Sequence, residues 1–99
     1  MQFRHGDVII EKVKSLPTEK RKSTHLILAH GEITGHSHQI KERNSAVLYE
    51  TPTDLFLHVI ADEATVVHEE HAPITLKEGC YRVWRQREYS PEEIRVIRD

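Results

Sequence analysis

Short runs of apolar and β-branched residues, each followed by a turn-forming residue, recur along the whole chain and limit the folds open to it. Such runs are visible at residues 8–13, 25–30, 36–42, 46–50, 55–60, 64–68, 73–76 and 80–85. Many short runs at close intervals indicate strands and favour an all-β architecture. We therefore expect residues 1–99 to form one mainly β domain, a small β-barrel or sandwich, with a jelly-roll as one closure that fits the strand count.

Turn signals separate several of these runs. Residues 51–54 form a Thr-Pro-Thr-Asp sequence in which proline occupies the second position of a β-turn. We also expect a turn at 62–63 and a hairpin bend through 77–79, because charged residues and a glycine interrupt the apolar pattern there. Residues 18–24 are polar and basic, and we expect them to be a solvated loop.

One helix signal is present, near the end of the sequence. Ser90 is a good N-cap residue, and Pro91 and the acidic pair that follows it are typical of a first helical turn. The apolar residues in 94–97 are too few to sustain a longer helix. The sequence therefore predicts one short C-terminal helical turn.

The composition excludes several classes of protein. The chain is 37% hydrophobic and 30% charged, which is typical of a soluble globular domain. No apolar run approaches the roughly 20 residues of a membrane helix, and no apolar signal segment follows Met1. The net charge of −2 makes nucleic acid an unfavourable partner, and the single cysteine, Cys80, cannot form an internal disulfide. We therefore expect a cytoplasmic protein without a membrane partner.

Eight histidines are the most unusual part of the composition. His36 and His38 lie two residues apart in a predicted strand, so both imidazoles point to one face. A second pair, His68 and His71, flanks two glutamates, and a turn there would bring the two rings side by side. The sequence predicts that these two segments meet inside one cavity.

Histidines from two strands offer the donors that a divalent metal ion needs. The expected ligands are His36 and His38 together with His68 or His71, with Zn, Fe, Ni or Mn as the candidate ions. Glu42 is a further candidate ligand, although the charged sequence 41–43 is also typical of a solvated face. The acidic residues 69–70 are either a polar turn or additional carboxylates near the metal. The alternative for all these histidines is an ordinary hydrogen-bonded role on surface strands.

The stretch from His36 to Glu42 resembles the first cupin motif, in which two histidines separated by one residue precede a glutamate. His36, His38 and Glu42 occupy the matching positions. The resemblance implies a small cupin-like β-barrel with a divalent metal near its centre. The second cupin motif, a proline, a glycine and then a histidine, is not present in that order.

A larger part of the chain is similar to a family of small uncharacterised bacterial and phage-type β-domains. The sequences Gly-Glu-Ile-Thr-Gly-His-Ser-His at 31–38 and His-Glu-Glu-His at 68–71 carry this likeness. No activity is established for that family, so the resemblance implies no reaction.

The function expected from the sequence is therefore metal binding by a small β-barrel, with a bound small molecule as a further expectation and the reaction left open. The alternative is a non-catalytic interaction module that uses a free sheet edge or the face of Trp84 to bind a partner or a second copy. Nucleic-acid binding by the aromatic and arginine residues of 81–89 is disfavoured, because strand alternation divides the arginines between two faces. A pH-responsive role of the clustered histidines is a third alternative.

Overall fold

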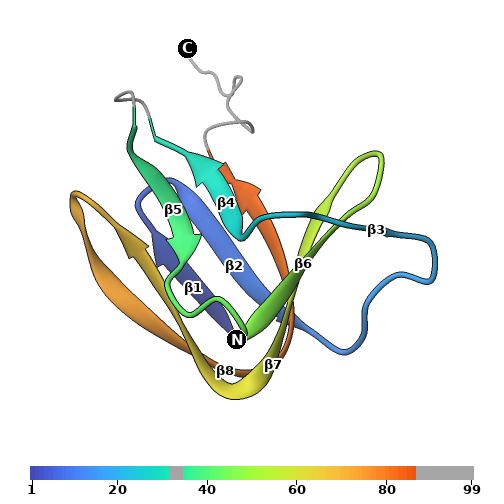
Figure 1. Ribbon diagram of the computed structural model, residues 1–99. Helices are drawn as coiled ribbons and strands as arrows, with labels where there is room; N and C mark the ends of the chain where they lie inside the picture. Colours follow the sequence, from blue (N-terminus) through green and yellow to red (C-terminus); the bar gives the residue numbers. More distant parts are fainter. Residues whose placement is uncertain (32–34, 87–99) are drawn as a thin grey trace.

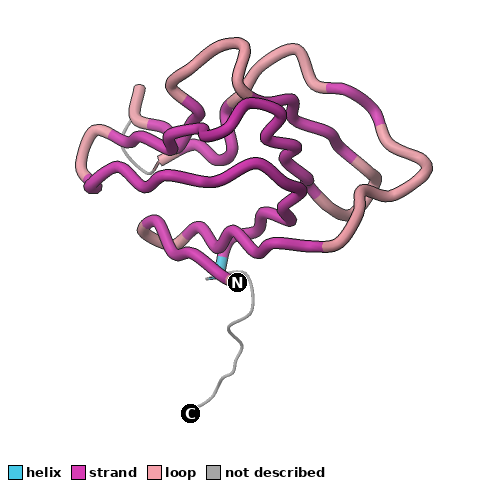
Figure 2. Tube along the Cα trace, turned by 90° about the horizontal axis from the view of Figure 1, so that it is seen from below, coloured by secondary structure: helices cyan, strands magenta, loops and turns pink. Residues whose placement is uncertain are grey.

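The computed structural model describes residues 1–31 and 35–86, and its regular elements are eight β-strands. In chain order these are β1 (Gln2–His5), β2 (Val8–Val13), β3 (Arg21–Lys22), β4 (Ile27–His30), β5 (Ser37–Ile40), β6 (Ala46–Glu50), β7 (Leu55–His68) and β8 (His71–Arg85). All pairs are antiparallel, in the order β1-β2-β8-β7-β5-β4, and β6 pairs with both β7 and β3. The sheet curls into a half-barrel (Figures 1 and 2). The described residues contain no helix of the length and apolarity that crossing a membrane requires.

The two longest strands, β7 and β8, form the spine of this sheet. The first half of β7 pairs with β6, from Leu55 to Val59, and its last part pairs with β5 at Val66 and Val67. The register between β7 and β8 shifts after Val59, which is a β-bulge that increases the local bend. The bend lets one strand serve two partners that lie in different parts of the half-barrel.

The expected turns at 62–63 and 77–79 are wrong. β7 and β8 run through both positions without a break, with Glu63 opposite Lys77 in the ladder. The charged residues lie on the outer face, where Lys77 Nζ is 2.8 Å from Glu63 Oε2. A strand with one solvated face can carry charged residues on that face, so charged residues do not by themselves indicate a turn.

Two of the expected strands hold, and two short strands were not expected. The strands at 8–13 and 46–50 are observed with the expected bounds, and 51–54 connect β6 to β7. Residues 21–22, expected to be loop, pair with β6 as β3, and β1 was not expected at all. The expected helical turn at the C-terminus lies outside the described residues.

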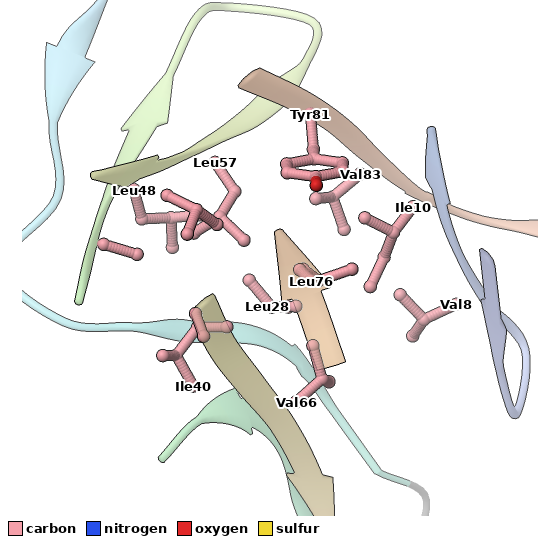
Figure 3. Close-up of a cluster of buried hydrophobic side chains, with 13 residues drawn as sticks. Val8, Ile10, Leu28, Ile40, Leu48, Leu57, Val66, Leu76, Tyr81 and Val83 are labelled. Carbon is pink, nitrogen blue, oxygen red and sulfur yellow. The ribbon is translucent and has the colours of Figure 1, made fainter. Parts of the chain in front are cut away.

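The core fills the inside of the curl (Figure 3). Ile10 of β2, Leu57 of β7 and Leu76 and Tyr81 of β8 are almost completely buried. Tyr81 avoids an unpaired hydroxyl because its O–H donates to the Lys77 carbonyl at 2.6 Å. This apolar interior ends at one side of the barrel, where the inward-facing positions are occupied by histidines.

Candidate functional site

Five histidines from separate parts of the chain meet at one end of the half-barrel. They are His5 at the end of β1, His36 just before β5, His38 within β5, His68 at the end of β7 and His71 at the start of β8. Ring centroids are 4.3 Å apart for His38 and His68, 4.8 Å for His68 and His71, and 4.9 Å for His5 and His38. The two histidine segments therefore meet as the sequence predicted.

The topology explains how these side chains come together. β5 pairs antiparallel with the end of β7, so the residues before Gln39 lie beside those after Val67. The β7–β8 connection is a turn at residues 69–70, which places His68 opposite His71 in the ladder. Three strands, β2, β8 and β7, separate β1 from β5 in the sheet, and the curl carries β1 across so that β5 lies in front of it (Figure 1).

A chain of hydrogen bonds fixes the orientation of two of the rings. The Ala72 carbonyl lies 2.9 Å from His5 Nε2 and can only accept, so His5 Nε2 carries a proton. In a neutral imidazole the other nitrogen is then an acceptor, and His38 Nδ1–H donates to His5 Nδ1 at 2.9 Å. His38 Nε2 is left with its lone pair free, 3.8 Å from Asp7 Oδ1.

Burial keeps this pair of rings uncharged. Desolvation, followed by the positive charge that His68 and His5 would carry, lowers the pKa of His38 from 6.5 to about 4. Desolvation also lowers the pKa of His5, against the opposing effect of its hydrogen bond to Ala72. Neutral imidazole is the form that binds a metal ion.

His36, His68 and Glu69 form the tightest group of potential ligands, with one donor atom of each within 4.8 Å of the others. His36 Nδ1 is buried without a hydrogen-bond partner among the described residues, at 3.6 Å from Glu70 Oε2. The Ser37 N–H donates to Glu69 Oε1 at 3.1 Å and holds this carboxylate beside the rings. A hydrogen bond from its own backbone lowers the pKa of Glu69, and the bond from Ser37 lowers it further.

Two glycines allow the rings to approach the backbone. A Cβ at Gly6 would lie 2.8 Å from His71 Nε2, and a Cβ at Gly31 would lie 3.0 Å from His68 Nε2. Gly6 also has φ of +66°, in the left-handed region that favours glycine. Both glycines line the cavity between the rings, which has a volume of about 270 Å³.

A charged pair forms one wall of this cavity. Asp7 Oδ2 accepts hydrogen bonds from Arg85 Nε at 3.2 Å and Nη2 at 3.0 Å. Arg85 Nη1 also donates to the His30 carbonyl at 2.8 Å, so the guanidinium connects β8 to the end of β4. Asp7 and His5 were not among the residues expected at the site, because β1, which ends at His5, was not predicted from the sequence.

Glu42 is the one predicted ligand that the structure does not bring to the cluster. Its side chain is exposed, and its two carboxylate oxygens accept hydrogen bonds from the Thr65 N–H at 2.8 Å and the Thr65 hydroxyl at 2.7 Å. These bonds lower the pKa of Glu42. The alternative interpretation of 41–43 as a solvated charged face fits this placement better than the cupin-like ligand set does.

Comparison with known proteins gives a family and no activity. A family model described as a domain of unknown function, DUF8820, matches residues 4–86. Searches of curated proteins and of solved structures gave no match. The matched region contains β2 to β8 and all five clustered histidines. Because the match covers most of its length, the chain belongs to the domain family of unknown function DUF8820.

Proposed function

We propose that this domain binds one divalent metal ion between its clustered histidines. The observation that carries the proposal is the convergence of His36, His68 and Glu69, each of which offers a donor atom within 4.8 Å of the others. His36 Nδ1 is buried and has no hydrogen-bond partner among the described residues. A buried imidazole nitrogen without a hydrogen bond is unfavourable unless something else satisfies it. A metal ion would do so at His36 Nδ1.

The ring separations support the same proposal. Two imidazoles on one tetrahedral Zn²⁺, with Zn–N of about 2.0–2.1 Å, hold their centroids roughly 5 Å apart. The His36–His68 and His68–His71 centroid distances are 5.7 and 4.8 Å. Small shifts of side chains would bring these rings to a common ion.

The donor set indicates the kind of ion. Two histidines and one carboxylate form a ligand set of zinc enzymes and of non-haem Fe(II) sites. His38 and His71 line the same cavity and are further potential ligands. Zn and Fe are therefore the leading candidates, with Ni and Mn as alternatives. A bound ion with an open position would act as a Lewis acid on a small oxygen-containing ligand.

Metal binding should disturb one backbone hydrogen bond. His68 Nδ1 accepts the Glu70 N–H at 2.9 Å. Coordination through Nδ1 would use that lone pair, and coordination of neutral imidazole through Nε2 would place a proton on Nδ1. Either mode removes the acceptor of the Glu70 N–H, so binding of the metal ion should shift the Glu70 amide resonance.

The test is metal content and affinity of protein prepared without a histidine tag or chelator. We expect about one ion per chain and a lower Tm after EDTA, because an ion that binds only the folded state stabilises it. His36→Ala, His68→Ala and Glu69→Gln should each weaken binding by at least about tenfold. His25→Ala is the matched control, because this histidine lines a different cavity. Less than about 0.2 ion per chain, with a Tm unaffected by EDTA, would overturn the proposal.

A further inference from the structure

A second cavity lies where β7 changes partner, outside the histidine cluster. The segment 23–26, which leads into β4, bridges β6 and β5 at this point. The Ser23 N–H donates to the Leu48 carbonyl at 2.8 Å, and the Ile40 N–H donates to the Leu26 carbonyl at 3.0 Å. Under this bridge is a groove of about 630 Å³, which is the size of a small-molecule site.

The inner part of the groove is apolar. Leu26 and Leu48 line it from the segment 23–26 and from β6. Ile60 also lines it and is 50% exposed, a large value for an isoleucine in a strand. Ile60 follows the buried Val59, and strand alternation turns its side chain to the outer face of the sheet. An apolar side chain is therefore available on the exposed side of the groove.

The rim of the groove is positively charged. Lys22 and Arg43 line it, both are exposed, and neither forms an ion pair within the described part of the chain. His25 Nδ1 accepts the Ile27 N–H at 3.1 Å, so neutral His25 carries its proton on Nε2 as a further donor. None of the described residues that line this groove is acidic. The lining of this groove therefore carries two positive charges and no negative charge, although the whole chain has a net charge of −2.

We propose that this groove binds an amphiphilic organic anion, with its charged head at Lys22 and Arg43 and its apolar body against Ile60. A carboxylate and a phosphate head share the required chemistry, because each accepts charge-assisted hydrogen bonds from cationic side chains. The apolar floor supplies the hydrophobic contribution and the rim supplies the orientation. This site is independent of the proposed metal site, since the two cavities share no described lining residue.

The experiment is titration of the ¹⁵N-labelled full chain, in the presence of EDTA, with four probes followed by amide chemical shifts. The probes are octanoate, octyl phosphate, octanol and inorganic phosphate. We expect at least one of the two octyl anions to shift amides of residues 22–26, 43–48 and 60, with saturation. The octyl anion that binds with the higher affinity identifies the preferred head group, carboxylate or phosphate. Octanol and inorganic phosphate should each bind at least about fivefold more weakly, because each lacks one half of the interaction.

Variants separate the charged and apolar contributions. The double variant Lys22→Gln, Arg43→Gln should weaken binding of the octyl anion by about three- to tenfold, the loss expected for two exposed ion pairs. Ile60→Ser should weaken it by a similar factor while leaving the Tm nearly unchanged, since that side chain is half exposed in the free protein. Lys14→Gln is the matched control, an exposed lysine that does not line the groove.

Each of the following results would overturn the proposal. The first is the absence of saturable shifts with both octyl anions. The second is equal affinity for octanol, which would mean that the cations take no part. The third is unchanged affinity in the double variant, or shifts that map to residues away from the groove.

Discussion

His5 and His38 share a hydrogen bond of 2.9 Å between their Nδ1 atoms, although β2, β8 and β7 lie between their strands in the sheet. This contact closes one end of the half-barrel with polar side chains. The Ala72 carbonyl fixes the proton of His5 on Nε2, so His5 Nδ1 accepts the hydrogen bond from His38 Nδ1–H. The unprotonated nitrogen of His38 is therefore Nε2. The arrangement leads directly to a prediction about tautomers.

His38 should be the Nδ1–H tautomer in the metal-free protein. Long-range ¹⁵N–¹H correlation spectra of the imidazoles measure this directly, without any metal or substrate. His5→Phe keeps a ring at the position and removes the acceptor, so His38 should change to a mixture of tautomers. If His38 is one of the ligands, the same variant should also weaken metal binding by about 10- to 100-fold, as loss of a group that orients a ligand does. An Nε2–H tautomer of His38 in the unmodified protein would contradict the proposed hydrogen-bond direction.

The stability of the metal-free protein should fall as the pH decreases from 6.5 towards 4. The pKa of His38 is about 4 in the folded chain and near its ordinary value of 6.5 in the unfolded chain. Between these values the unfolded state binds more protons, so its free energy decreases relative to the folded state. The slope is at most about 1.4 kcal/mol per pH unit for one histidine, and the lowered pKa of His5 acts in the same direction.

Urea unfolding in EDTA at several pH values measures this slope. His38→Gln removes the titrating group and should make the curve flatter in this pH window. A slope that His38→Gln leaves unchanged would assign the effect to other groups.

Gly6→Ala should be more harmful than Gly35→Ala. Both glycines have positive φ, so alanine costs roughly 1–2 kcal/mol of backbone strain at either position. A Cβ at Gly6 would also lie 2.8 Å from His71 Nε2 and 3.2 Å from His38 Cε1, whereas no atom of the described residues lies within 4 Å of a Cβ at Gly35. We expect both variants to have a lower Tm, and only Gly6→Ala to lose metal affinity, measured by calorimetry. Equal affinities of the two variants would show that His71 and His38 do not hold the ion.

Glu42→Gln should leave metal binding unchanged, whereas Glu69→Gln should weaken it. The Glu42 carboxylate accepts hydrogen bonds from Thr65, whereas Glu69 lies beside His36 and His68. Each substitution removes one negative charge from an exposed glutamate, so a general electrostatic effect would change both affinities alike. Metal titrations of the two variants under the same conditions compare the cupin-like ligand set with the observed cluster. Loss of affinity in Glu42→Gln alone would favour the cupin-like set.

The strands were predictable where a run of apolar and β-branched residues has clear ends. Val8–Val13 and Ala46–Glu50 are such runs between turn-forming residues, so their bounds could be derived from the sequence. β7 and β8 were divided wrongly because a bulge and an acidic pair look like a turn when only neighbouring residues are considered. Their continuity depends on cross-strand partners such as Glu63 and Lys77, which local patterning does not contain.

The sequence by itself determined a mainly β domain and placed His36 and His38 on one face, because strand alternation is a local property of the backbone. It also placed His68 and His71 on either side of a polar turn. The tertiary structure alone decided that His5 and Asp7 join them and that Glu42 does not, since these placements depend on how far the sheet curls. Curvature is set by the bulge in β7 and by packing of the whole core, and a contact between strands at distant positions in a sheet follows only from both together.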